Sequence, residues 1–135
     1  MRTPLLLNSF KNFIMYTISK EFMFSASHQL KGLPEGHPCS RVHGHNYTVK
    51  IELKSKTLDE RGFVLDYGEL RPIKDWIDSN LDHRHLNDVM GVLNPTAENI
   101  ATFIYYTFKR DFPLLFAVEV SETPKTNARY EQTDN

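Results

Sequence analysis

The sequence predicts an α+β domain in which helices cover one face of an antiparallel sheet. Three observations indicate this class. Two segments in the first half are strand-like, two later segments repeat apolar residues every three or four positions, and strand-like sequence returns near the C-terminus. Strands followed by helices and then by further strands are typical of α+β domains, whereas α/β domains alternate the two kinds of element.

The two clearest predicted strands lie in the first half of the chain. Residues 15–28 are rich in aromatic and β-branched side chains. Residues 30–41 contain two glycines and two prolines and are predicted to form a loop. Residues 45–54 alternate strictly, so that one face of this strand is apolar and consists of Tyr47, Val49, Ile51 and Leu53.

A turn is expected at 59–62, followed by a short return strand at 63–67. Two amphipathic helices come next, at 68–81 and from residue 95 to 110. The first carries the stripe Leu70, Ile73, Ile77 and Leu81, and the second can be capped by Thr96.

The C-terminal part returns to strand-like sequence. Residues 114–123 predict a strand, with a short partner near 128–132.

Composition and charge narrow the classes of protein. The 135 residues are 40% hydrophobic, which suits a single domain with its own core. A formal net charge of −1 gives no basic surface for nucleic acid. One cysteine permits no intrachain disulfide and suits a reducing compartment, and we find neither a signal peptide nor a stretch that would span a membrane. We therefore expect a cytoplasmic protein with no membrane partner.

The domain is expected to occupy residues 15–135. Residues 1–14 fit this pattern poorly, and Met15 could itself be a start residue. We expect residues 1–14 to be a disordered or non-native N-terminal extension.

Three of the six histidines and the only cysteine fall within residues 37–47. His43 and His45 are two positions apart at the start of the alternating strand, so both side chains point to one face, and Gly44 leaves room for another group. His28 ends the preceding strand and is the natural third ligand. Because zinc takes three or four protein ligands, these histidines predict a zinc site.

Cys39 leaves two kinds of zinc site open. If its thiolate completes the tetrahedron, the site is closed and structural. If Cys39 stands beside the metal instead, the three histidines leave a position for water or substrate, and the thiol, with a pKa lowered by the cation, can act as a base or nucleophile.

Two further groups are candidates for the same chemistry. Asp82 next to His83 could orient an imidazole for proton transfer, although a helix C-terminus with satisfied histidines explains this pair at least as well from the sequence alone. Glu122 ends an apolar strand, where it is either solvated or able to accept two hydrogen bonds from a ligand with paired N–H donors.

These motifs together resemble the 6-pyruvoyltetrahydropterin synthase family, and most closely its 6-carboxytetrahydropterin synthase branch. The matching motifs, in the family's order, are "FSASHQL", "PEGHPCSRVHGHNY", "VLDYGEL", "LDHRHLND", "NPTAENIA" and "VEVSET". The resemblance implies a tunnelling fold, with an antiparallel sheet, two helices on one face and assembly into a barrel-like homo-oligomer, commonly a hexamer. Active sites would then lie between subunits.

The resemblance also implies a role for each candidate residue. His28, His43 and His45 would bind zinc, Cys39 would abstract a proton, and His83 with Asp82 would be the second proton-transfer group. Glu122 would hold the pterin and join the proton relay. The implied substrate is 7,8-dihydroneopterin triphosphate, whose side-chain hydroxyls the zinc would polarise.

Three branches of the family differ in their product. The spacing of three residues between Cys39 and His43 resembles that of the 6-carboxytetrahydropterin synthase branch. This branch releases acetaldehyde and triphosphate and supplies 7-deazapurine (queuosine) biosynthesis. The 6-pyruvoyl branch, of the biopterin-type pathway, is the alternative. A third branch, which has glutamate in the cysteine's neighbourhood and acts in folate synthesis, ranks lower because Cys39 is present, although Glu35 lies upstream. A non-enzymatic, closed-site zinc module is the remaining alternative. Lys31 or Arg41 could bind the triphosphate.

Overall fold

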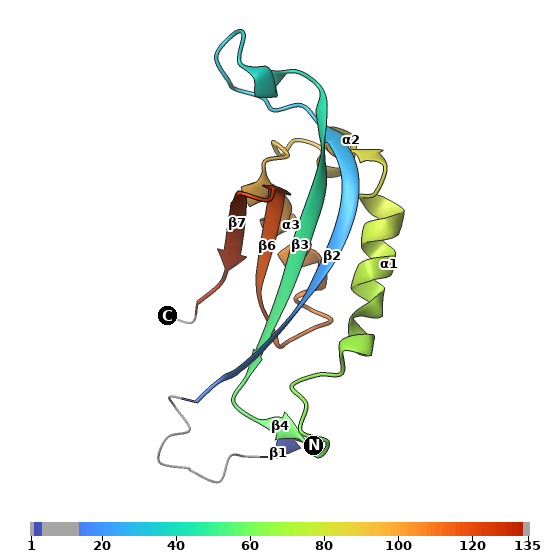
Figure 1. Ribbon diagram of the computed structural model, residues 1–135, viewed down its shortest axis with the longest axis vertical. Helices are drawn as coiled ribbons and strands as arrows, with labels where there is room; N and C mark the ends of the chain where they lie inside the picture. The colour runs from blue at the N-terminus through green and yellow to red at the C-terminus, as the bar shows by residue number, and fades with distance from the viewer. Residues whose placement is uncertain (1, 4–13, 134–135) are drawn as a thin grey trace.

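The computed structural model describes residues 2–3 and 14–133, and its centre is a five-stranded sheet in the order β5-β2-β3-β6-β7 (Figure 1). The strands are β2 (Tyr16–His28), β3 (His43–Ser55), β5 (Arg84–His85), β6 (Leu115–Thr123) and β7 (Thr126–Glu131). All neighbours pair antiparallel except β5, which forms a short parallel bridge to β2. The expected antiparallel sheet is therefore confirmed.

Helices cover one face of this sheet. They are α1 (Arg71–Asn80), α2 (Leu86–Met90) and α3 (Ala97–Phe108), with short 3-10 turns at Pro38–Ser40 and Tyr67–Leu70. The stripe expected on the first helix is buried, and so are the four apolar positions of β3 from Tyr47 to Leu53. Figure 1 shows α3 behind β3 and β6 and α1 beside β2. The buried side chains of these helices and of the sheet form one core. Among the described residues, no helix is both long and apolar enough to cross a lipid bilayer.

Local hydrogen bonds set the helix boundaries close to those expected. The Thr96 hydroxyl accepts a hydrogen bond from the backbone N–H of Asn99 at 3.1 Å, so α3 begins after its predicted cap. The first predicted helix is divided between the 3-10 turn and α1, with Pro72 at the start of α1, where it displaces no hydrogen bond.

The return strand expected at 63–67 is wrong. The Asp59 carboxylate accepts hydrogen bonds from the backbone N–H groups of Arg61 and Phe63, and the backbone N–H of Asp59 donates to the Phe63 carbonyl. These bonds fold the segment into a turn, which buries Val64 to 3% exposure in the core. Short apolar runs fit several structures, and here local hydrogen bonds decide between them.

Neither α2 nor the β5 bridge beside the end of β2 was expected. The N-terminal extension predicted for 1–14 falls mostly outside the described residues. Of its residues, Arg2–Thr3 form β1, which pairs with β4 (Leu58–Asp59). The prediction for the rest of this segment stays a prediction.

Candidate metal and catalytic site

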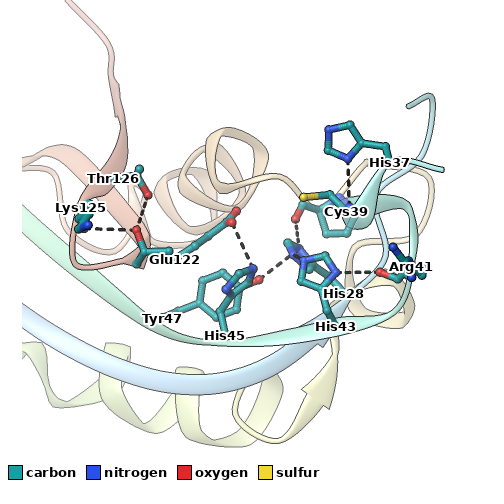
Figure 2. Close-up of polar contacts among 12 residues, drawn as sticks. His28, His37, Cys39, Arg41, His43, His45, Tyr47, Glu122, Lys125 and Thr126 are labelled. Atoms are coloured by element: carbon teal, nitrogen blue, oxygen red, sulfur yellow. Dashed lines mark hydrogen bonds and ion pairs between the residues drawn. The ribbon is translucent and has the colours of Figure 1, made fainter. Parts of the chain in front are cut away.

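The three predicted ligand histidines meet at the junction of β2 and β3. The register of these strands places His28 directly opposite His43 and Ala26 opposite His45. Side chains alternate between faces, so all three imidazoles lie on the core face of the sheet, beyond Tyr47 (Figure 2). One ligand nitrogen from each ring lies within 4.8 Å of the other two. His28 is fully buried, whereas the other two rings are half-buried.

Hydrogen bonds orient two of these rings. The His28 Nδ1 lies 2.7 Å from the Pro95 carbonyl, and the His43 Nδ1 lies 2.7 Å from the Arg41 carbonyl. A carbonyl only accepts, so each Nδ1 carries the proton and each Nε2 of the neutral rings presents a lone pair. These two Nε2 atoms face each other at 2.9 Å. Two facing lone pairs do not form a hydrogen bond, and a cation between them removes their repulsion.

The third ring presents another unpaired atom. His45 Nε2 is buried and has no hydrogen-bond partner, although it lies 3.3 Å from a Glu122 carboxylate oxygen. Buried polar atoms without partners are rare, and ligand histidines commonly donate their other nitrogen to a backbone carbonyl. The donor set and its orientation therefore fit a metal ion held by three imidazoles.

Burial shifts the pKa values of His28 and of the neighbouring Tyr47. Burial, the largest effect, lowers the pKa of His28 below its ordinary value, which keeps the ring neutral and able to bind a cation. Tyr47 places its hydroxyl 3.1 Å from the same Nδ1, and burial raises the pKa of this phenol. The sequence placed Tyr47 on the correct face but gave it no role. The contact with the Pro95 carbonyl has no sequence signal, because any residue supplies a carbonyl.

Cys39 does not belong to the group of mutually close ligand atoms found among the described residues. It lies in the 3-10 turn Pro38–Ser40 of the β2–β3 loop and is half-buried. Figure 2 shows it beside the three histidines. This arrangement fits a thiol next to a three-histidine site better than a thiol that completes a closed one.

Asp82 and His83 form a pair, but neither belongs to the group of close ligand atoms formed by the three histidines. His83 Nδ1 is 2.9 Å from Asp82 Oδ2, and the other carboxylate oxygen accepts a hydrogen bond from the Ser25 backbone N–H at 2.8 Å. These contacts, with the Ser25 bond the larger, hold the pKa of Asp82 below its ordinary value. His83 has a φ of 59° and a side chain that is 83% exposed. The pair is thus fixed at the outer edge of β2.

The hollow beside this pair opens on the other face of the sheet. It has a volume of about 510 Å³, and its lining includes Ser25, Ser27, His83 and His85 together with His45 of the histidine cluster. One chain therefore brings His28, His43 and His45 together, with Glu122 beside His45, whereas His83 lies outside this group of close ligand atoms among the described residues.

A second hollow, of about 650 Å³, lies next to Glu122. Its lining includes Glu21, Met23, Thr48, Ser121 and Thr123. This volume is within the range that small-molecule sites occupy, about 300–1,000 Å³.

An antiparallel sheet with helices on one face and a three-histidine cluster at a strand junction defines a class of α+β proteins with a candidate metal site. Comparison with known proteins identifies the class more closely. The chain belongs to the 6-pyruvoyl tetrahydropterin synthase family, whose sequence profile matches residues 17–133. The predicted family and its tunnelling fold are confirmed, whereas the barrel-like oligomer stays a prediction.

Individual relatives agree with this assignment. A 6-carboxy-5,6,7,8-tetrahydropterin synthase of Synechocystis is 39% identical over 122 residues, which cover 86% of this chain and 93% of the relative. A protein of the same name from Rickettsia bellii is 31% identical over 140 residues, covering 90% and 96%. The solved 6-pyruvoyl tetrahydropterin synthase of Caenorhabditis elegans has a TM-score of 0.78 at 26% identity, covering 89% of this chain and 97% of that one.

Proposed function

We propose that this protein converts 7,8-dihydroneopterin triphosphate and water to 6-carboxy-5,6,7,8-tetrahydropterin, acetaldehyde and triphosphate, as a step toward 7-deazapurines such as queuosine. One observation carries the proposal: three imidazoles whose ligand nitrogens lie within 4.8 Å of one another stand beside a cysteine that is outside the ligand set. A structural site would use that cysteine as its fourth ligand, whereas a catalytic site keeps a position open.

The metal in this proposal is zinc, held by His28, His43 and His45. Three imidazoles suit zinc, and when bound it would supply Lewis-acid polarisation of the substrate's side-chain hydroxyls. The backbone carbonyls of Pro95 and Arg41 fix the tautomer of two ligand rings. Cys39 would abstract a proton from the substrate side chain, which requires its thiolate form.

Asp82 and His83 would be the second proton-transfer group, supplied by a neighbouring copy of the chain. The Asp82 carboxylate fixes the His83 Nδ1, which leaves Nε2 to exchange a proton with substrate. The left-handed backbone of His83 costs roughly 1 kcal/mol, a cost that is typical of functional sites. Because His83 lies outside the ligand group of its own chain and is largely exposed at the edge of β2, its position supports a homo-oligomer, hexameric in this proposal, with sites between subunits.

Glu122 would bind the pterin. Its carboxylate lies beside His45 and next to the hollow of about 650 Å³, and a carboxylate matches the paired N–H donors of an aminopyrimidinone ring. Its contact with His45 would also let it join the proton relay that serves the substrate side chain.

Product analysis tests this proposal. The zinc-loaded protein is incubated with 7,8-dihydroneopterin triphosphate, and the products are identified by mass spectrometry. We expect 6-carboxytetrahydropterin with acetaldehyde, and loss of both in Cys39→Ala while the metal is retained. Formation of 6-pyruvoyltetrahydropterin would contradict the proposed branch.

The two alternatives predict different results. A 6-pyruvoyl synthase, the activity named for the C. elegans neighbour, would eliminate triphosphate without releasing acetaldehyde. A closed zinc module would show no turnover, and its metal-bound Cys39 would be protected from alkylation. The exclusion of Cys39 from the cluster of close ligand atoms favours the enzyme over the module.

A further inference from the structure

The loop that carries Cys39 has little apolar packing of its own. Between β2 and β3 most of its side chains are exposed, from Gln29 to Val42. Apolar burial is the usual way to fix a segment, and a loop without it moves unless other contacts hold it. A proton-abstracting thiol, however, must stay within about 3–3.5 Å of its substrate atom. Another set of contacts is needed to fix this loop.

Two asparagines supply these contacts. The Gln29 backbone N–H donates to Asn87 Oδ1 at 2.8 Å, and Asn87 Nδ2 donates to the Gln29 carbonyl at 2.8 Å. Asn94 pairs with Lys31 in the same way, at 2.9 Å and 3.1 Å. An asparagine side chain has one acceptor and one donor group that match a residue's backbone N–H and C=O. Each asparagine thus pairs with the loop as a neighbouring strand would.

Leu30, which lies between Gln29 and Lys31, is hydrogen-bonded to the backbone of Cys39. The Leu30 backbone N–H donates to the Cys39 carbonyl at 3.0 Å, and the Gln29 side chain donates to the Ser40 carbonyl at 2.9 Å. In an extended chain, backbone groups of successive residues point in opposite directions. Asn87 and Asn94 therefore hold one side of residues 29–31, while the other side holds the cysteine turn.

Both asparagines stand on ordered parts of the chain. Asn87 lies in α2 between the buried Leu86 and Met90. The Asn94 carbonyl accepts hydrogen bonds from the Thr96 backbone N–H at 2.8 Å and from Asn99 Nδ2 at 2.9 Å. The next residue, Pro95, is the one whose carbonyl orients His28. One segment thus supports both a metal ligand and the base of the cysteine loop.

We infer that Asn87 and Asn94 are positioning residues that set the place of Cys39 relative to the three histidines. The inference rests on the proposed function, in which Cys39 is the proton-abstracting group. It gives the unexpected helix α2 a purpose, since α2 carries Asn87 to the base of the loop.

The test uses the full chain with Asn87→Asp and Asn94→Asp, singly and together. Aspartate keeps the acceptor for the loop N–H but cannot donate to the carbonyl, which it repels instead. Asn80→Asp is the matched control, because Asn80 also donates to a backbone carbonyl, that of Trp76, far from the loop. The double alanine variant Asn87→Ala/Asn94→Ala removes both pairings without adding charge.

Three measurements are made on each variant. They are kcat and KM with 7,8-dihydroneopterin triphosphate, the alkylation rate of Cys39 by iodoacetamide, and the absorption spectrum of the cobalt-substituted protein. We expect kcat to fall by ~10- to 100-fold with a smaller change in KM, since a shift of about 1 Å in a reacting group has effects of this size. Cys39 alkylation should become several-fold faster as the loop loosens, while the cobalt spectrum stays unchanged.

Two results would overturn the inference. In the first, kcat and Cys39 alkylation in the asparagine variants match those of wild type and of Asn80→Asp. In the second, cobalt binding is lost together with activity, which would show that the asparagines support the histidines and not the cysteine. If wild type fails to turn over this substrate, the proposed function fails, but the alkylation rates still decide whether the asparagines hold the cysteine loop.

Discussion

The two faces of β3 carry different side chains. On the face that α1 and α3 cover, β3 presents a row of apolar side chains that ends in His45 and His43. On the other face, the same strand presents Lys50 and Glu52. The covered face is a hydrophobic core with the three-histidine cluster at its end. The open face is charged, and Arg129 on β7 binds Glu52 on β3 and Glu119 on β6 there.

This difference shows how one sheet separates two tasks. The covered face fixes the three histidines through strand register, so that few other contacts are needed to orient them. The open face and its edge carry Asp82 and His83, which would complete the site only for another copy of the chain. The comparison can be tested by removing a group from each face in turn, and the largest effect is expected on the covered face.

The strongest test removes a metal ligand from the covered face. We expect His43→Ala to lower zinc affinity by at least ~100-fold, because loss of even the outer partners of metal ligands costs about 10- to 100-fold. His43 is only half-buried, so the variant should still fold. Zinc content by mass spectrometry and the dissociation constant from chelator competition measure the effect.

His85→Ala is the matched control for this variant. His85 bonds to the Ser27 hydroxyl at 2.9 Å and lines the hollow on the other face. Its removal should leave zinc affinity unchanged. Equal losses in the two variants would show that the histidines on the two faces are not separate in function.

Sequence reasoning recovered the covered face well, and the reason is periodicity. Alternation in β3 placed Tyr47, His45 and His43 on one side, and the helical repeat placed Ile73 and Ile77 against it. A two-residue spacing determines which face a side chain occupies, so two ligands could be assigned to one face from the sequence alone. His28 required the additional assumption that the two strands pair, which the register confirms.

Other features depend on contacts that leave no periodic pattern. The turn at 59–63, which replaces the start of the expected return strand, follows from hydrogen bonds to Asp59, and the orientation of His28 follows from the carbonyl of Pro95. The sequence also placed His83 next to Asp82 without showing which face of the sheet they would occupy. That depends on how β5 approaches β2, a contact between residues 58 positions apart in the chain.

A second prediction concerns the open edge. If His83 serves the site of a neighbouring copy, the inactive variants Cys39→Ala and His83→Asn should complement each other when they are unfolded together and refolded as a mixture. Random assembly of equal amounts restores about a quarter of the sites, since each intact site needs the right variant on both sides. Turnover in the refolded mixture measures this.

Each variant refolded alone is the control, and both should stay inactive. Zinc content in each should match wild type, because neither residue belongs to the three-histidine cluster. No recovery of activity in a mixture that assembles to the normal size would show that Cys39 and His83 act within one chain. Activity of His83→Asn refolded alone would show that His83 has no role.

The smallest effect is expected in the charged network of the open face, and it should depend on pH. The hydrogen bond from Arg129 holds the pKa of Glu52 below its ordinary value of 4.5. A carboxyl group whose pKa is lower in the folded state stabilises the protein above its unfolded pKa, and this stabilisation disappears as the pH falls through the folded pKa. Glu52→Gln should therefore reduce the free energy of unfolding at pH 7 by about 1–2 kcal/mol.

The difference between Glu52→Gln and wild type should shrink as the pH falls below 4.5. Urea unfolding at pH 7 and at lower pH values, at one fixed protein concentration, measures it. Glu131→Gln is the matched control, because Glu131 binds the same arginine at 2.6 Å but its side chain is 37% exposed. Its effect should stay below about 1 kcal/mol, as for other exposed ion pairs. Equal effects of the two substitutions at every pH would mean that the burial of Glu52 adds nothing to its ion pair with Arg129.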